Sequence, residues 1–408
     1  MLAGLLAGTA RAETEIPGTG AQVSGWLLGR FGYGLNAGNH DLVLNQQLLQ
    51  LQVQHPDIAG WRFDGKLWAE REAALEPSTY RKVDIRELVV ARKTSSYSVA
   101  LGRQIVVWGK ADGFKLVDIV NPLDLRESIL NDDIRSRLPL WMANVQFFPG
   151  EDQELQFLLI PQTYHDRISP PGSQFDFSAG LPAGATVLPL QVPAGRPENW
   201  SFGARWSATL GDLNVHAMAL RTLTGAPVVF PSVDPQRGLV LRPEVVRRTM
   251  IGAAADTSLG DAVLRLELAV TPDEYRAHAT PSGIPELRRE TAIRSLVGVD
   301  WTLGDWFVSP QLFNVHAPGK PGIAAEPDGT YASLVVERKF LFDKLTTRVY
   351  AATGLDRRDY WIAGSARYQV SDQLELFLGI DLLGGDRRQF FGEFNRRDRV
   401  VAGATIFF

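Results

Sequence analysis

The feature that most constrains this chain is a two-residue alternation of apolar and polar side chains, repeated in short segments from end to end. In the segment IAGWRFDGKLWAE, Trp61, Phe63 and Leu67 share one face, while Arg62 and Asp64 lie on the other. Successive side chains of a β-strand point to opposite faces of the sheet, so this period predicts strands that are apolar on one side. Segments of about ten residues with this pattern, separated by turns, are typical of transmembrane β-barrels.

Eighteen segments carry the alternation and are predicted as strands: 22–33, 43–53, 60–70, 83–92, 97–106, 141–148, 153–161, 200–210, 213–222, 246–258, 262–271, 292–303, 306–315, 331–341, 346–354, 360–370, 373–383 and 399–408. An even count, about 18 with 16 as the alternative, favours an all-β fold, a transmembrane antiparallel β-barrel. A soluble β-sandwich is the competing fold, but it does not require alternate apolar residues in nearly every strand. A closed sheet of this size encloses an aqueous channel unless loops fill it.

The connections between these segments alternate between short and long. Tight turns rich in glycine, aspartate and serine are predicted at 93–96, 149–152, 211–212, 260–261, 304–305, 342–344 and 371–372, because these residues suit turn geometry. Longer links lie at 107–140, 162–198, 223–244, 273–291, 317–330 and 384–398. Short periplasmic turns and long external loops are the arrangement of a transmembrane barrel, with both termini on the periplasmic side.

Both ends of the chain carry signals expected of an exported barrel. Residues 1–12 are expected to be the remnant of a signal peptide, with a disordered apolar tail as the alternative, and 13–408 to form the barrel. The last segment, RVVAGATIFF, ends on Phe408 after apolar residues at alternate positions. This ending resembles the signal that hands Gram-negative barrel proteins to their assembly machinery. We therefore expect that machinery as a partner through Phe408, and the outer membrane of a Gram-negative bacterium as the location.

Composition argues against several other classes of protein. The 42 basic and 46 acidic residues leave a formal net charge of −4, too balanced to favour nucleic-acid binding. The absence of cysteine excludes a disulfide framework and a thiolate metal site. No stretch approaches the roughly 18 uninterrupted apolar residues of a membrane-spanning helix.

Enzyme signatures are scarce, and we expect no catalytic residue, metal or cofactor. No His and Glu pair has the helical spacing of a metal site. Some outer-membrane barrels are hydrolases that use serine and histidine on the barrel wall, so Ser207 and His216 form a candidate pair. His216 shares its face with Asn214, however, and a polar residue of the lumen is the simpler interpretation.

The most distinctive stretch is the long link at 107–140, the third external loop. Its carboxylates, cations and apolar residues predict a packed loop that folds into the lumen and narrows it. Opposed charges in a confined lumen order water and discriminate between solutes. A plug that only stiffens a wide barrel is the alternative. The predicted channel-lining residues are Arg103, Gln104, Trp108, Lys110, Asp112, Lys115, Asp118, Asn121, Asp124 and Arg126.

The same stretch carries a family resemblance, which covers about fifty residues. GRQIVVWGKADG, DIVNPLD and RLPLWMANVQFF are similar to the hallmark region of proteobacterial outer-membrane barrels of unassigned function. Those barrels are often associated with RND-type exporters of lipids or hydrophobes and with a companion lipoprotein. The matching positions are Gly102, Arg103, Gln104, Trp108, Gly109, Asp118, Asn121, Pro122, Asp124 and Pro139. A weaker likeness to alginate-export barrels rests on residues 102–104. The resemblance implies a role in envelope transport and an exporter or periplasmic partner.

Paired arginines recur in the predicted external loops and at the strand rims. Guanidinium groups bind phosphate in a bidentate fashion. Contact with lipopolysaccharide phosphates is one interpretation, and a funnel for an anionic substrate is the other. The predicted outer-rim anion contacts are Arg288, Arg289, Arg357, Arg358, Arg387, Arg388, Arg396 and Arg397.

These observations favour an outer-membrane channel for a polar, anionic or amphipathic solute, selected by lumen charge and pore width and open to gating by a periplasmic partner. The alternative is a plugged, non-conducting accessory or structural barrel of an envelope export system. The sequence leaves the substrate, the direction of transport and the oligomeric state open.

Overall fold

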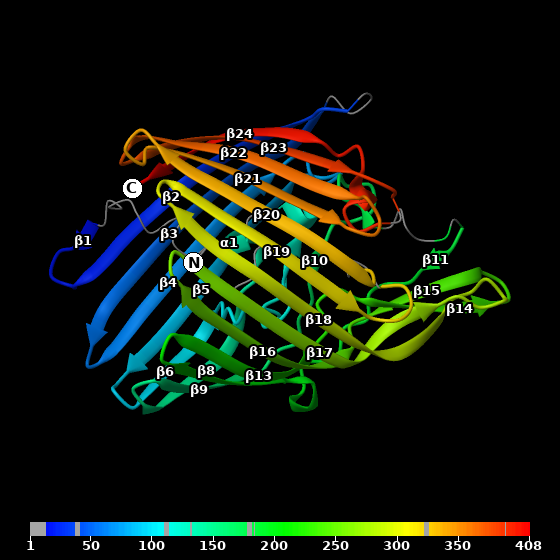
Figure 1. Ribbon diagram of the computed structural model, residues 1–408, viewed down its shortest axis with the longest axis horizontal. Coiled ribbons are helices and arrows are strands. Elements are labelled where there is room, and N and C mark those ends of the chain that lie inside the picture. Colours follow the sequence, from blue (N-terminus) through cyan, green and yellow to red (C-terminus); the bar gives the residue numbers. More distant parts are fainter. Residues whose placement is uncertain are drawn as a thin grey trace.

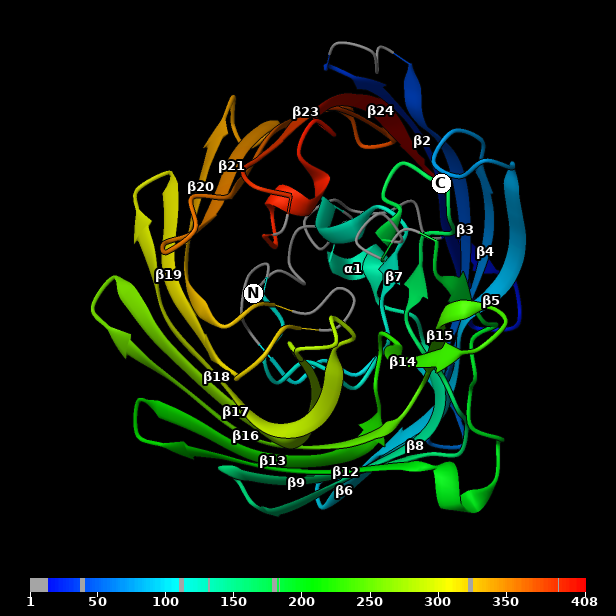
Figure 2. The same cartoon turned by 90° about the vertical axis from the view of Figure 1, so that its right-hand side faces the viewer.

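The computed structural model describes residues 14–36, 41–109, 114–130, 133–177, 182, 184–321, 326–387 and 389–408. Within these ranges the chain forms a closed antiparallel β-barrel of eighteen strands (Figures 1 and 2). The barrel strands are β2 (Ala21–Gly34), β3 (Leu42–Ile58), β4 (Trp61–Glu72), β5 (Tyr80–Lys93), β6 (Tyr97–Gln104), β8 (Leu140–Gly150), β9 (Gln153–Ile160), β12 (Ser201–Leu210), β13 (Leu213–Leu223), β16 (Arg247–Leu259), β17 (Ala262–His278), β18 (Glu286–Leu303), β19 (Trp306–His316), β20 (Gly329–Phe340), β21 (Leu345–Gly354), β22 (Tyr360–Ser371), β23 (Leu374–Gly384) and β24 (Arg399–Phe407).

The first and last barrel strands close the sheet. β2 pairs with β24 from Trp26 opposite Phe407 to Gly34 opposite Arg399. Phe408 extends this seam, because its backbone N–H donates to the carbonyl of Gly25 at 2.9 Å and its carbonyl accepts from the N–H of Gly25 at 2.6 Å. The apolar C-terminal segment is therefore tied into the sheet. The short strand β1 (Thr14–Ile16) pairs with the start of β2 outside the ring.

All eighteen strands predicted from the alternation are present, and the predicted fold class is confirmed. The short turns lie at one end of the barrel and the long connections at the other, left and right in Figure 1. The main difference concerns the predicted link at 273–291, where β17 continues to His278 and β18 begins at Glu286. Pro272 lies where the β17–β18 register shifts, between Thr271 and Glu274, and a bulge at this point tolerates the missing N–H of proline, so the strand continues past it.

The two faces of the sheet differ as the alternation requires. On β19, Leu312 is 53% exposed on the outer face, whereas Phe313, the next residue, is 1% exposed inside the barrel. On β18, Val297 is 48% exposed and Leu296 is 2% exposed. An outer wall of exposed leucine, valine and phenylalanine is stable only against an apolar medium or an apolar partner.

Chain segments fill the lumen at the long-loop end. Residues 105–139, the link between β6 and β8, are called the lumen segment here. It contains β7 (Asp124–Leu125), η2 (Ser128–Leu130) and α1 (Asp133–Ser136), and Figure 2 shows β7 and α1 inside the ring. β7 pairs in parallel with β10 (Arg167–Ile168), so the link after β9 enters the lumen as well.

The remaining elements belong to the long links. β14 (Val228–Asp234), β15 (Gly238–Glu244) and β11 (Thr186–Val187) form a small sheet beyond the long-loop end of the wall (Figure 1). The short helices η4 (Pro197–Asn199) and η5 (Gly392–Phe394) lie in the links before β12 and β24. In the described part of the chain, the helices are too short or too polar to be membrane spans.

Candidate functional site

The lumen segment is anchored by its own polar side chains where it leaves the wall. The Asn121 carboxamide accepts from the N–H of Val106 at 2.8 Å and donates to the carbonyl of Leu138 at 2.9 Å. The Asp118 carboxylate accepts from the N–H of Trp108 at 3.1 Å. Both side chains satisfy backbone groups that no strand can pair inside the barrel. Asn121 therefore holds the start and the end of the segment together.

A buried ion pair reinforces this anchor. Arg137 donates to Asp118 through Nε at 2.9 Å and through Nη2, and both side chains are buried. Arg86, on β5, donates to the carbonyl of Arg137. The pair thus connects both ends of the lumen segment to the wall at β5.

One side of the lumen segment is apolar and packs across the barrel. The Phe114 ring stacks on Phe313 of β19, with ring centroids 4.3 Å apart. The Trp108 indole donates from Nε1 to Gln156 of β9 at 2.9 Å and fills the space beside Gly203 of β12, where a Cβ atom would lie 2.8 Å from the ring. With the apolar inner side chains of β8 to β21, this side forms one continuous buried cluster.

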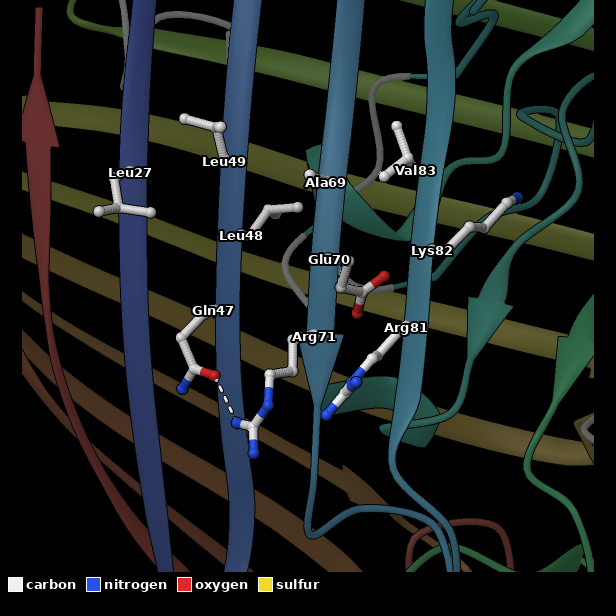
Figure 3. Close-up of a pocket in the computed structure, with 10 residues that line it drawn as sticks. All are labelled: Leu27, Gln47, Leu48, Leu49, Ala69, Glu70, Arg71, Arg81, Lys82 and Val83. Carbon is white, nitrogen blue, oxygen red and sulfur yellow. Dashed lines mark hydrogen bonds between the residues drawn. The ribbon is translucent and has the colours of Figure 1, made fainter.

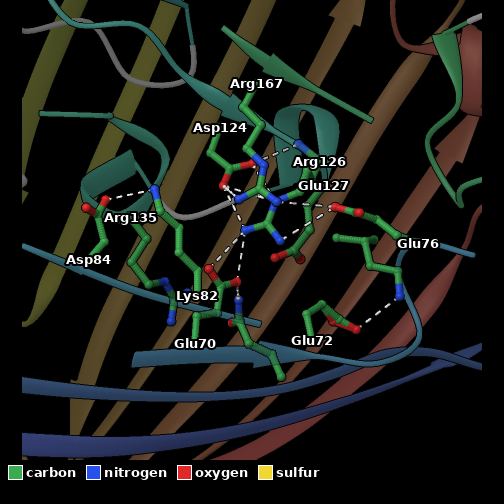
Figure 4. Close-up of polar contacts among 12 residues, drawn as sticks. Glu70, Glu72, Glu76, Lys82, Asp84, Asp124, Arg126, Glu127, Arg135 and Arg167 are labelled. Carbon is green, nitrogen blue, oxygen red and sulfur yellow. Dashed lines mark hydrogen bonds and ion pairs between the residues drawn. The ribbon is translucent and has the colours of Figure 1, made fainter. Parts of the chain in front are cut away.

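The opposite side of the segment is ionic. Arg126 donates to Asp124 through Nε at 3.0 Å and through Nη2 at 2.8 Å, and also through Nη2 to Glu70 of β4 at 2.9 Å (Figure 4). Arg167 lies 3.5 Å from Glu76 and 3.6 Å from Asp124. Burial alone would lower the pKa of Arg126, but its carboxylate partners raise it above the ordinary value, so the guanidinium stays charged.

The side chain of Glu127 bridges the seam that closes the barrel. Its Oε1 accepts from Nη2 of Arg30, on β2, at 2.5 Å, and its Oε2 lies 2.9 Å from Nη1 of Arg399, on β24. All three side chains are buried. Burial raises the pKa of Glu127, but the positive charges of Arg30 and Arg399 outweigh this and lower it to about 2. Arg399 has a second partner in Asp381, at 2.8 Å, whereas Arg30 otherwise donates to the amide of Gln46.

Two further segments enter the lumen, at positions that the alternation of side chains does not indicate. After β9, the Asp166 carboxylate accepts from the N–H of Leu123 at 2.7 Å, and its pKa is raised by burial. In the link before β24, Phe391 is 1% exposed and donates its N–H to Asp359 at 2.7 Å. Aromatic pairs inside polar links, such as 175–177 and 390–391, were the signal available in the sequence.

Nearer the short turns, the inner wall is lined by paired charges. The ion pairs between inward side chains include Lys66 with Glu87 at 3.0 Å, Arg205 with Glu154 at 3.1 Å, Arg265 with Asp300 at 2.5 Å and Arg348 with Glu337 at 3.7 Å. Glutamines 50, 52 and 54 of β3 continue the polar lining. Because most of these charges are paired, the wall is polar without a dominant sign.

Ser207 and His216 meet on this inner wall. The two side chains are hydrogen-bonded between Oγ and Nδ1 at 2.9 Å, and Nε2 of His216 lies 4.0 Å from Oδ1 of Asp256. The backbone of Ser207 is paired on both sides, to β9 and β13, so its N–H cannot serve as an oxyanion donor. The trio fits a polar lumen lining better than a hydrolytic site. The described residues hold no cluster of three or more potential metal ligands.

The predicted channel-lining residues fall into three groups. Trp108, Asp118, Asn121, Asp124, Arg126 and Gln104 are buried in or beside the lumen segment. Arg103, next to the last residue of β6, donates to Asp84 of β5 at 2.7 Å, and Lys115 donates to Ser136 at 3.3 Å. Lys110 and Asp112 lie outside the described residues. A role for these residues in selecting solutes stays a prediction.

The predicted rim arginines lie at the long-loop end. Arg288 pairs with Glu286 at 2.7 Å, Arg289 donates to the Tyr275 hydroxyl at 3.0 Å, Arg357 donates to Gln389 at 3.0 Å and Arg397 donates to Gln174 at 3.3 Å. Arg358, Arg387 and Arg396 are exposed, and Arg388 lies outside the described residues. Anion binding by this set stays a prediction.

Comparison with known proteins identifies the family of the chain and structures with a similar fold. Its sequence matches the model of a family described as "Protein of unknown function (DUF1302)" over residues 76–374, and no curated protein matches it. Its structure is similar to Acinetobacter baumannii OccAB1, with a TM-score of 0.58 and 10% identity over 98% of this chain and 99% of that one. OccK5 (OpdH) and the outer membrane protein OpdK, both from Pseudomonas aeruginosa, each give a TM-score of 0.54 and 11% identity over 95% of this chain and 98% of theirs. At such identities the likeness shows the fold, a porin-like barrel.

Proposed function

We propose that this chain, which belongs to the DUF1302 family, is an outer-membrane channel that selects a small amphipathic solute by the width and charge of its lumen. The lumen segment narrows the channel. The apolar outer wall supports a location in a membrane, and the porin-like fold supports the outer membrane. We extend the proposal to a periplasmic partner, which would reach the lumen from the short-turn end.

The observation that carries this proposal is the two-sided lumen. One side is the apolar cluster around Phe114 and Trp108, and the other is the ionic network of Arg126, Glu127 and Arg30. Partly exposed residues border each side, such as Phe390 beside the apolar cluster and Arg167 beside the ionic network, and would offer complementary surfaces to a solute with an apolar body and a polar group. The paired charges nearer the short turns would make ion selectivity weak, because paired side chains cancel each other's field at a distance.

The extent of packing around the lumen segment favours one second candidate, a plugged and non-conducting accessory barrel. The segment contacts walls on opposite sides of the barrel, at β19 through Phe114 and at the β2–β24 seam through Glu127. Such contacts would hold a plug in place.

Conductance of the purified barrel in a planar bilayer separates the two candidates. We expect small, steady steps from the wild type, with weak preference between cations and anions in a salt gradient. Deletion of 109–138 should give larger steps, since Gln104 and Leu140 are paired neighbours that the remaining residues can join. A silent wild type with a conducting deletion would support the plugged barrel. Silence from both folded proteins would contradict the channel.

A reversible lock tests the same point without removing Glu127. A Cβ atom at Gly252 of β16 would lie 2.9 Å from Cγ1 of Val117, so cysteines at these two positions are within reach of a disulfide. The chain has no native cysteine to interfere. Equal conductance of oxidised and reduced Val117→Cys/Gly252→Cys would mean that solute passes beside a stationary lumen segment, whereas lower conductance of the oxidised form would mean that the segment moves near Val117. The matched controls are the two single cysteine variants under the same redox conditions.

A further inference from the structure

The outer wall of β2 to β5 carries two consecutive rows of side chains with opposite character. Leu27, Leu49, Ala69 and Val83 lie opposite one another across the four strands and form the first row. Two residues nearer the long-loop end, Gly29, Gln47, Arg71 and Arg81 form the second row. The wall therefore changes from apolar to basic over roughly 7 Å, the length of two strand residues.

These rows border a hollow of about 410 Å³ on the outer face (Figure 3). Leu27 and Val83 flank it, and Ala69, with its small side chain, lies between them. Gly29 adds space, because a Cβ atom there would meet nothing within 4 Å. An apolar hollow on this face would accept a hydrocarbon chain.

The positive charges of Arg71 and Arg81, the two arginines beside the hollow, are not balanced by a carboxylate among the described residues. Arg71 and Arg81 are directly opposite each other on β4 and β5, both are exposed, and like charges in such a pair are destabilising. Arg71 donates to the Gln47 carboxamide at 2.7 Å (Figure 3). Among the residues that the structure describes, no carboxylate forms an ion pair with either arginine. An anion between the two guanidinium groups would turn repulsion into attraction.

We propose that this surface is a binding site for a membrane lipid with a phosphate head group, most specifically the lipid A portion of lipopolysaccharide. An acyl chain occupies the hollow, and a phosphate group lies between Arg71 and Arg81, where each guanidinium can donate in a bidentate fashion. The long-loop end is the external end in the proposed orientation, so this site faces the outer leaflet. The inference rests on the proposed membrane location but not on conduction.

The test uses the full-length barrel in detergent micelles and measures binding of bisphosphorylated lipid A by native mass spectrometry. Arg71→Gln/Arg81→Gln should bind lipid A at least about tenfold more weakly, the factor that corresponds to 1.4 kcal/mol. Ala69→Leu, which fills the hollow and leaves the charge unchanged, should also weaken binding. Phosphatidylcholine, whose head group has no net charge, should bind poorly to the wild type.

A matched control variant has the same net charge as Arg71→Gln/Arg81→Gln. Arg62→Gln/Arg92→Gln removes two exposed arginines from the short-turn ends of the same strands and should bind lipid A like the wild type. Equal loss in both double variants would overturn the site, since charge alone would then explain binding. Displacement of lipid A by inorganic phosphate at an equal concentration would also overturn it, because the acyl chain in the hollow would then contribute nothing to binding. A wild type that conducts but binds no lipid A contradicts only this inference, and one that binds but does not conduct contradicts only the channel.

Discussion

Replacement of Glu127 by glutamine tests whether the lumen segment stabilises the closing seam. The substitution keeps the shape of the side chain and removes the charge that faces Arg30 and Arg399. Arg399 keeps Asp381, but Arg30 is left buried with only the amide of Gln46. Breaking one partner of a buried ion pair typically costs about 3 to 5 kcal/mol, because the other charge stays desolvated.

The lowered pKa of Glu127, which arises from the same two arginines, agrees with this magnitude. A decrease from 4.5 to about 2 corresponds to roughly 3 kcal/mol of stabilisation of the folded state. Because the pKa in the folded protein lies below that of the unfolded chain, this stabilisation is complete above pH 4.5. It is lost as the pH falls from 4.5 towards 2.

Urea unfolding of the barrel in detergent, followed by tryptophan fluorescence, measures both effects. We expect Glu127→Gln to lower the free energy of unfolding at pH 7 by about 3 kcal/mol. Its stability should also fall less than that of the wild type between pH 4.5 and 2. The double variant Arg30→Gln/Glu127→Gln should recover part of the loss, since no buried charge is then left without a partner. Equal stability of Glu127→Gln and wild type, with the same acid dependence, would refute the reasoning.

Three further predictions concern the packing and titration of the lumen. Phe114→Ala removes the ring stacked on Phe313 and should cost about 3 kcal/mol in the same urea assay; an unchanged midpoint would mean that the segment is not held by this contact. Gly203→Ala should destabilise by about 1 to 3 kcal/mol through overlap with the Trp108 ring, whereas Gly29→Ala, in open space, should be nearly neutral. Burial raises the pKa of Glu393 to about 7, so wild-type stability should fall as the pH rises from 4.5 to 7, and Glu393→Gln should lack this decrease.

The alternation of side chains was sufficient to predict the barrel because its cause is local. Each strand must present apolar residues outward, so the period of two repeats in every strand and does not depend on which strands are neighbours. The segment RVVAGATIFF could therefore be assigned to a strand before its partner was known. The extension of β17 beyond Pro272 could not be predicted, because it depends on the bulge in its pairing with β18.

The partners inside the lumen could not be predicted in the same way. Glu127 and Arg30 are 97 residues apart, and nothing in the local sequence distinguishes this carboxylate from Asp124. Asn121 and Asp118 were predicted as channel lining, yet their observed contacts are hydrogen bonds that organise the lumen segment. Such contacts depend on the closed barrel, which brings distant side chains to one level of the lumen.

The two sides of the lumen segment should differ in how readily they move. Displacing the second half, which carries Arg126, Glu127 and Arg137, would leave several buried charges unpaired, at about 3 to 5 kcal/mol for each pair broken. The first half is fixed at its ends by the hydrogen bond from Trp108 to Gln156 and by the ion pair of Asp118 with Arg137. Between these ends, around Phe114 and Val117, its contacts are apolar, and such contacts are non-directional and can re-form after a shift against the wall. A conformational change that widens the lumen and preserves the barrel seam is therefore expected in the first half. The second half would remain attached to β2, β4 and β24.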